Sequence, residues 1–337
     1  MQRIEELKEL LRSPKKIIIT THHKPDADAL GSSLALRLYL EQLSHTATVV
    51  APTDYPSFLN WMPGNDEVLI YEGNEAKCES LAKEADIVFC LDFNALSRIN
   101  AYGEIVKKAP GKKVMIDHHL EPEDFADISF SDTKASSTAE IIHTIITDLG
   151  DNALINNSIG ECIYAGIMTD TGSFRHPSTT LQAHLITADL MKKGVNTSRI
   201  HQLIYDNNTE VRLRFLGFSL SEKLVIKKEF STAYITLNGN ELARFDSKTG
   251  DTEGLVNFAL SIKDINLAVV IIERPDGIKM SFRSKGDFSV NELARKHFEG
   301  GGHRNAAGGR SPLSLKETEK KFLTILPEYQ KELNSIS

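Results

Sequence analysis

The sequence predicts an α/β protein with two domains: an N-terminal doubly wound parallel sheet and a smaller α+β domain, joined by a helical connection. The first observation is length, because 337 residues are many for a single hydrophobic core. The second is that short apolar runs alternate with helical spacing in the first half, which is typical of a parallel sheet. The third is that alternating strand patterns begin near Lys223, which indicates antiparallel pairing.

The first half opens on the run Ile17 to Thr21, whose β-branched residues predict a buried strand. Leucine spacing then predicts a helix over Ala29 to Leu43. Ser137 to Glu140 predicts a capping box at the start of a later helix. The remaining expected elements are strands at 47–51, 67–71, 87–91 and 113–116 and helices at 75–85 and 157–168.

The second half begins with consecutive helices expected over Leu181 to Leu220. Antiparallel pairs are expected between 223–229 and 232–238 and between 266–273 and 278–284, the second joined by a turn at Arg274 to Gly277. The run Gly300 to Gly309 is expected to be a loop, and a terminal helix is expected from Ser314. The predicted domains are 1–185 and 221–337, with 186–220 as a helical linker.

Composition narrows the classes of protein. With 41% hydrophobic and 25% charged residues and no run of 18 apolar residues, we expect a soluble protein without a membrane span. The charged N-terminus lacks a signal-peptide pattern, and three cysteines without CxxC spacing predict neither a disulfide framework nor a zinc knuckle, so we expect a cytoplasmic protein. The net charge of −7 argues against binding long duplex nucleic acid.

Acidic and imidazole side chains follow three of the predicted strands. They are His22, Asp26 and Asp28 after the first strand, Asp92 after the strand at 87–91, and Asp117, His118 and His119 after the strand at 113–116. In open α/β sheets this edge is where ligands bind. Close carboxylates repel each other unless a cation lies among them, so the pattern predicts a metal site. Asp170, at the end of a predicted helix, is disfavoured by the helix dipole and would also benefit from a cation.

Six segments together carry a family resemblance. THHKPDADALGS, LDF, DHH and GIMTDTGSF, in that order, resemble the four motifs of the DHH phosphoesterase superfamily. SFRS at 281–284 and GGGHRNAAGG at 300–309 are similar to the DHHA1 substrate-binding domain of one of its branches. The resemblance covers nearly the whole chain, and six motifs in register are specific where any one would be weak.

The resemblance implies a dinuclear site, usually with manganese, for which Mg²⁺ or Co²⁺ could substitute. One ion would be held by His22, Asp26 and Asp92, and the other by Asp28, Asp92, His118 and Asp170. The ions would share a hydroxide that attacks phosphorus in line. His119 would donate to the scissile phosphate, and Asp117 would orient a ligand histidine. The second domain would bind the substrate's other phosphate or terminal nucleotide through Arg283, Gly301, Gly302 and His303.

The RecJ exonucleases of this superfamily are larger, and its inorganic pyrophosphatases lack the GGGH segment, so the chain looks like the short members that degrade nano-RNA. An acidic protein with one short anion-binding segment suits single-stranded oligoribonucleotides of about two to five residues, including dinucleotides. The products would be nucleoside 5′-monophosphates, and 3′-phosphoadenosine 5′-phosphate (pAp) would be a second substrate. The alternatives are a phosphodiesterase of cyclic di-AMP or pApA and, from another class, a non-catalytic nucleotide sensor. The resemblance also permits a homodimer.

Overall fold

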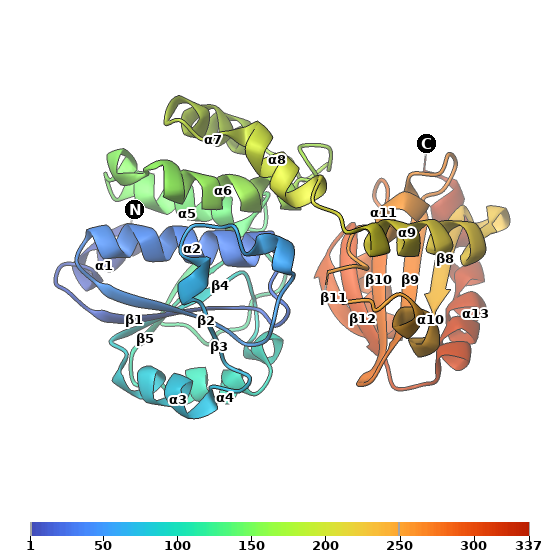
Figure 1. The fold of residues 1–337 in the computed structure, drawn as a ribbon, viewed down its shortest axis with the longest axis horizontal. Helices are drawn as coiled ribbons and strands as arrows, with labels where there is room; N and C mark the ends of the chain where they lie inside the picture. Colours follow the sequence, from blue (N-terminus) through green and yellow to red (C-terminus); the bar gives the residue numbers. More distant parts are fainter. Residues whose placement is uncertain (1, 249, 337) are drawn as a thin grey trace. The chain divides into compact units, whose positions relative to one another are not determined.

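The computed structural model describes residues 2–248 and 250–336, and the chain divides into two units, Met1–Asn207 and Asn208–Ser337 (Figure 1). Among the described residues, no helix is long and apolar enough to cross a membrane.

The first unit contains a six-stranded sheet in the order β3-β2-β1-β4-β5-β6, with all neighbours parallel. The strands are β1 (Lys16–Thr21), β2 (Thr46–Ala51), β3 (Leu69–Ile70), β4 (Ile87–Leu91), β5 (Lys112–Asp117) and β6 (Ile128–Ser131). The strand order reverses between β1 and β4, which makes the ends of these two neighbours the topological switch point of the sheet. The prediction of a doubly wound parallel sheet is confirmed.

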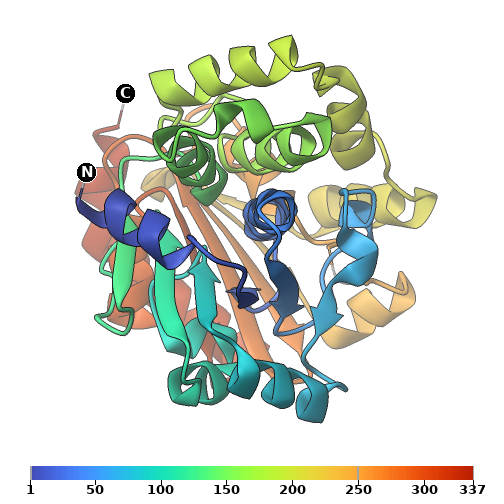
Figure 2. The same ribbon diagram turned by 90° about the vertical axis from the view of Figure 1, so that its left-hand side faces the viewer.

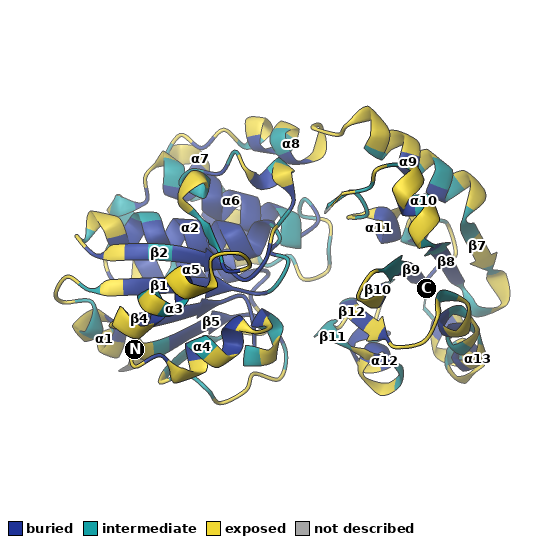
Figure 3. Cartoon of the chain, turned by 60° about the horizontal axis from the view of Figure 1, so that its bottom comes forward, coloured by how far each residue is buried: buried dark blue, intermediate teal, exposed yellow. Residues whose placement is uncertain are grey.

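Helices cover both faces of this sheet, as Figures 1 and 2 show. The helices of this unit are α1 (Gln2–Leu10), α2 (Ala27–Gln42), α3 (Glu75–Glu84), α4 (Tyr102–Lys108), α5 (Thr138–Asp148), α6 (Asn157–Asp170), α7 (Leu181–Lys192) and α8 (Thr197–Tyr205). Helices α2, α5 and α6 lie on one face of the sheet and α3 and α4 on the other, whereas α7 and α8 pack on the outer side of α5 and α6. Ile17 and Ile19 belong to the hydrophobic core on the α2, α5 and α6 side, whereas Ile18 belongs to the core on the α3 and α4 side. This alternation is the two-residue period of a strand that is buried on both faces, and Figure 3 shows the central strands β1 and β4 almost entirely buried.

Close packing of α2 on α6 brings the strand ends and the helix ends together. A Cβ added at Gly31 of α2 would lie 2.4 Å from the carbonyl oxygen of Cys162 in α6. A Cβ added at Gly166 of α6 would lie 2.5 Å from a carboxylate oxygen of Asp28. Both positions therefore require glycine at this helix separation.

The second unit contains a mixed six-stranded sheet in the order β11-β12-β10-β9-β8-β7. Its strands are β7 (Leu224–Lys227), β8 (Thr232–Leu237), β9 (Leu267–Arg274), β10 (Gly277–Ser284), β11 (Glu299–His303) and β12 (Ala306–Ser311). β8 and β9 pair in parallel and the other neighbours are antiparallel, as predicted for the pairs β7–β8 and β9–β10.

The helices of the second unit form two further layers. They are α9 (Glu210–Glu222), α10 (Gly239–Arg244), α11 (Leu255–Leu260), α12 (Val290–His297) and α13 (Leu315–Asn334). Residues of α12 and α13 share one core with Ile278, Met280 and Phe282 of β10, and residues of α9 to α11 share another with alternate residues of β8 and β9. Five 3₁₀ helices, at 57–59, 65–67, 96–99, 152–154 and 228–230, complete the regular structure among the described residues.

Two local predictions are wrong. The glycine-rich run at 300–309 is not a loop: it forms most of the β11–β12 hairpin, whose residues pair from Glu299 with Arg310 to His303 with Ala306. The capping box predicted at the start of α5 does not form either. Ser137 accepts the backbone N–H of Glu140, but the Glu140 carboxylate accepts the N–H of Ser136 instead of that of Ser137.

The packing of α2 on α6 can be tested by Gly31→Ala. The added methyl group would meet the Cys162 carbonyl oxygen, so the helices must separate, and overpacking of this kind costs about 1–3 kcal/mol. Denaturant unfolding should show a lower free energy of unfolding. The control is Gly217→Ala in α9, where no atom lies within 4 Å of the added Cβ, and alanine should be neutral or stabilising there. Equal stability of Gly31→Ala and wild type would contradict the observed helix contact.

Candidate metal centre

The turn after β1 orients Asp26 through a helix cap. Asp26 is the N-cap of α2, and its Oδ1 accepts the backbone N–H groups of Asp28 and Ala29, each at 3.0 Å. This cap starts the helix at Ala27, two residues before the predicted start. The second oxygen, Oδ2, lies 3.7 Å from Nε2 of His22.

The tautomer of His22 follows from its hydrogen bond. Its Nδ1 lies 3.0 Å from the carbonyl oxygen of His23, and since a carbonyl only accepts, Nδ1 carries the proton. Nε2 then faces Asp26 and Asp92, with Oδ2 of Asp92 at 3.4 Å. A neutral imidazole fixed in this way presents the lone pair of Nε2, as metal-binding histidines do.

Asp92 lies between two imidazoles at the end of β4. Its Oδ2 is 3.4 Å from Nε2 of His22 and its Oδ1 is 3.4 Å from Nε2 of His118. Its φ of +62° is left-handed, a conformation that aspartate adopts more readily than most residues. The two oxygens therefore face two different groups of donors, as a bridging ligand requires.

His118 follows β5, and its side chain faces three carboxylates. Its Nδ1 donates to the carbonyl oxygen of Ala135 at 3.2 Å. Its Nε2 lies 3.3 Å from Oδ2 of Asp170, 3.4 Å from Oδ1 of Asp92 and 3.8 Å from Oδ2 of Asp28. Asp170 is the last residue of α6, and Gly172 ends that helix with a φ of +55°.

Asp28 lies in the first turn of α2 and is fully buried. Its Oδ2 accepts the backbone N–H of Thr138 at 2.7 Å, and its Oδ1 accepts that of Ala139 at 2.9 Å. These are first-turn N–H groups of α5, which have no partner within their own helix. Asp28 therefore links the start of α2 to the start of α5, and each of its oxygens keeps a lone pair for a further partner.

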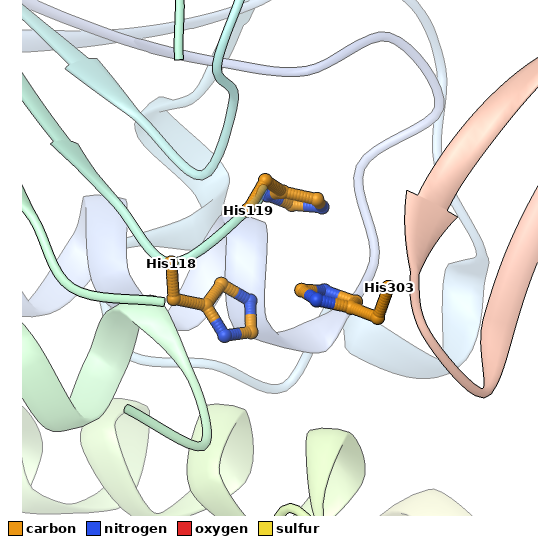
Figure 4. A group of neighbouring side chains, drawn as sticks. All are labelled: His118, His119 and His303. Carbon is orange, nitrogen blue, oxygen red and sulfur yellow. The ribbon is translucent and has the colours of Figure 1, made fainter. Parts of the chain in front are cut away.

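Asp117 and His119 form a buried pair beside Asp92, whose Oδ1 lies 3.7 Å from Nδ1 of His119. Nδ1 of His119 donates to Oδ1 of Asp117 at 2.7 Å. The partner of Asp117 is thus His119, and not one of the histidines expected to bind metal, which corrects that prediction. Figure 4 shows the imidazoles of His118 and His119 beside each other, with ring centroids 5.0 Å apart and planes inclined at 71°; His303, also drawn there, belongs to the second unit.

The protein compensates the charges of this cluster only in part. The imidazoles of His118 and His22 hold the pKa of Asp92 well below its ordinary value despite burial. Burial and the neighbouring carboxylates of Asp92 and Asp170 raise the pKa of Asp28 well above its ordinary value. Burial, with Asp26 and Asp92 nearby, raises the pKa of Asp170 to about 6. Divalent cations would remove this unfavourable repulsion.

The donor atoms also fit such ions. Within each of two groups the candidate atoms lie within 4.8 Å of one another: His22, Asp26 and Asp92, and Asp28, Asp92 and His118. Oxygen and imidazole donors without thiolates suit a hard or borderline divalent ion.

The residues expected to bind substrate lie on two strands of the second sheet, its edge strand β11 and the interior strand β10. Arg283 is on β10, and Gly301, Gly302 and His303 are on β11, with β12 between the two strands. Ala306 of β12 pairs with both Arg283 and His303, so these two residues are two strands apart at the same level of the sheet. Backbone N–H of Gly302, whose φ is +148°, donates to Oδ1 of Asn291 in α12. The sequence analysis did not identify Asn291, because a single asparagine in a helix gives no indication that it accepts a hydrogen bond from a distant glycine.

Comparison with known proteins agrees with this fold. The model of the DHH family N-terminal domain matches residues 16–167, and that of the DHHA1 domain matches residues 230–332. The chain is similar to a probable bifunctional oligoribonuclease and PAP phosphatase NrnA from Streptococcus mutans, with 30% identity over 90% of this chain and 91% of the relative. It is also similar to the bifunctional oligoribonuclease and PAP phosphatase NrnA from Bacillus subtilis, with 29% identity over 87% of this chain and 88% of the relative. A cyclic-di-AMP phosphodiesterase PdeA of Listeria monocytogenes is 25% identical, over 97% of this chain and 50% of the longer relative.

A solved structure is similar over almost its full length. It is an exopolyphosphatase-related protein from Bacteroides fragilis, with a TM-score of 0.93 and 39% identity over 99% of this chain and 98% of that one. The fold and the site thus define a phosphoesterase, an enzyme that hydrolyses phosphoric esters. The chain belongs to the DHH family, with a DHHA1 domain in its second unit, which confirms the predicted family.

The donor set can be tested by His118→Ala. Loss of one imidazole from the group around Asp28 and Asp92 should weaken binding of one Mn²⁺ by at least about tenfold and abolish turnover, because that ion would lose one of its donor atoms. Calorimetric titration with Mn²⁺ measures the affinity. His184→Ala, which removes an exposed histidine of α7, is the control. Wild-type affinity and activity in His118→Ala would show that the ligand assignment is wrong.

Proposed function

We propose that the protein is a metal-dependent phosphodiesterase that degrades oligoribonucleotides of about two to five residues to nucleoside 5′-monophosphates and dephosphorylates pAp to AMP. The observation that carries this proposal is the gathering of all six predicted donors at the switch point of the first sheet, in a chain whose similar relatives are named oligoribonuclease and PAP phosphatase. We further propose 1–185 as the catalytic domain, 186–220 as a linker and 221–337 as the substrate-binding domain.

The residues fit a pair of ions, of which Mn²⁺ is the one we propose. His22, Asp26 and Asp92 would hold one ion, and Asp28, Asp92, His118 and Asp170 the other. Bound divalent ions lower the pKa of water and offset the charge that develops on phosphoryl oxygens during in-line displacement.

His119 has a specific requirement if it is to donate to phosphate. Its Nδ1–H is already donated to Asp117, so Nε2 can donate only when the imidazole is doubly protonated. Burial and the positive charge of Arg98 lower the pKa of His119 well below its ordinary value, which favours the neutral form before substrate binds. An incoming phosphate dianion favours the charged form, and Asp117 would stabilise it. His119 would thus take up its second proton together with the anion.

The second unit offers a surface suited to a phosphate. On β10, Ile278, Met280 and Phe282 face the core shared with α12 and α13, so the alternate residues Lys279, Ser281 and Arg283 lie on the opposite face. A guanidinium on this face can donate two parallel hydrogen bonds to phosphate oxygens. The glycines of β11 lack side chains, so an anion can approach their backbone closely.

A second candidate is hydrolysis of cyclic di-AMP or pApA, which the similarity to the Listeria phosphodiesterase favours. The chain spans half the length of that relative, whereas it spans about nine tenths of the NrnA relatives, and this difference favours the short-oligonucleotide reaction. A non-catalytic nucleotide sensor would be expected to lack a metal donor, and all six are present among the described residues.

A substrate panel tests the proposed reaction. The protein with Mn²⁺ should release AMP from a labelled adenosine dinucleotide and from pAp, with lower kcat/KM for cyclic di-AMP. Metal content is measured in the same samples. If the metal-bound protein released AMP from neither the dinucleotide nor pAp, the proposal would be refuted. A kcat/KM for cyclic di-AMP above those for the dinucleotide and pAp would instead support the second candidate.

Substrate binding by the second unit is tested by Arg283→Ala. Loss of a charge-assisted hydrogen bond to phosphate should raise KM for the dinucleotide at least about tenfold, with a smaller change in kcat. Lys279→Ala removes a cation from the same face of β10 and is the matched control. If both variants changed KM equally, the effect would be one of general charge and the role of Arg283 would be rejected.

A further inference from the structure

The segment 135–140, at the start of α5, contacts three of the six proposed ligands. The Ala135 carbonyl accepts the Nδ1–H of His118, and the backbone N–H groups of Thr138 and Ala139 donate to Asp28. The side chain of Thr138 reaches a third ligand, because its hydroxyl oxygen lies 2.9 Å from Oδ1 of Asp92. None of these three residues, Ala135, Thr138 and Ala139, has a role in the chemistry proposed above.

Thr138 is the one residue of this segment that bonds to two ligands. Its N–H donates to Oδ2 of Asp28 at 2.7 Å, and its hydroxyl must donate to Asp92, because an ionised carboxylate only accepts. Asp28 comes from the start of α2 and Asp92 from the end of β4, so the two ligands reach the site from different elements. Thr138 therefore links two parts of the chain whose carboxylates repel each other.

The Thr138 hydroxyl contacts the oxygen of Asp92 that faces His118, within the group of donors Asp28, Asp92 and His118. Oδ1 accepts the Thr138 hydroxyl and is also the oxygen 3.4 Å from Nε2 of His118. A hydrogen bond at this atom limits rotation of the carboxylate about its Cβ–Cγ bond. It thereby keeps Oδ2 directed at His22, 3.4 Å away, at the same time.

The position of Thr138 is itself determined by its surroundings. The residue is fully buried, and its branched Cβ restricts the rotamer of the side chain. The start of α5 is fixed by Glu140, whose carboxylate accepts the N–H of Ser136 at 2.9 Å and the hydroxyl of Thr180 at 3.0 Å. Thr180 is the N-cap of α7, so α5 is tied to the chain that follows Asp170.

We propose that Thr138 is a positioning residue of the metal centre, which holds the carboxylates of Asp28 and Asp92 in the orientation that binds the ions. This inference rests on the proposed function, because it takes both aspartates as metal ligands. Outer partners of this kind typically change metal affinity by about 10- to 100-fold when they are removed.

The experiment compares three variants with the wild type by calorimetric titration with Mn²⁺ alone. Thr138→Val keeps the shape of the side chain and removes the hydroxyl, and Thr138→Ser keeps the hydroxyl. Thr318→Val is the matched control, since Thr318 is also fully buried near the start of a helix and donates to Ser311, in the second unit. Thermal unfolding in EDTA checks that each variant is folded; if Thr138→Val is not, Thr138→Ala replaces it under the same criteria.

Thr138→Val should raise the Kd of Mn²⁺ about 10- to 100-fold, while Thr138→Ser and Thr318→Val stay within about threefold of wild type. Its turnover of the dinucleotide should need correspondingly more Mn²⁺, with KM for the dinucleotide unchanged at saturating metal. Wild-type affinity in Thr138→Val, or equal losses in the valine and serine variants, would overturn the inference. A wild-type protein that binds no Mn²⁺ would instead refute the proposed function on which the inference rests.

Discussion

The first unit depends on the buried carboxylate of Asp28. It accepts two N–H groups that α5 cannot satisfy within itself, and it lies close to the Nε2 of His118 and within reach of the charges of Asp92 and Asp170. Such a group is stable only if its hydrogen bonds are complete and its charge is compensated. The close approach of α6 at Gly166 follows from the same constraint, because the bare backbone leaves room for the carboxylate.

Much of the fold was predictable because the relevant signals are local. Apolar runs such as Ile87–Leu91 identify strands, and Asp92 and His118 follow strand ends, so a parallel sheet brings them to one edge. The short strand β6 (Ile128–Ser131), with half-buried residues throughout, has no comparable pattern and was not predicted. The glycine run at 300–309 was interpreted as a loop because glycine disfavours strands, but pairing with β10 and packing of Phe282 and Phe298 against Gly309 override that preference.

The candidate site was also predictable in its residues but not in the contacts between them. Residue type and position predicted which side chains would gather there, whereas their pairing depends on tertiary contacts that are distant in sequence. Thr138 and Asp92 are 46 residues apart, and the Asn291–Gly302 hydrogen bond joins a helix to an edge strand. Even Asp117 and His119, two residues apart, could not be paired in advance, because His118 stands between them and is an equally plausible partner by sequence.

The backbone of Asp92 narrows the replacements that evolution can accept at this position. Its φ of +62° excludes β-branched and bulky residues for steric reasons, while asparagine, aspartate and glycine tolerate it. Of these, asparagine keeps an oxygen that can accept the Thr138 hydroxyl but carries no charge, and glycine keeps neither. Both replacements that this backbone conformation tolerates therefore remove the negative charge. No substitution of Asp92 keeps both its backbone conformation and the charge that a bridging metal ligand supplies.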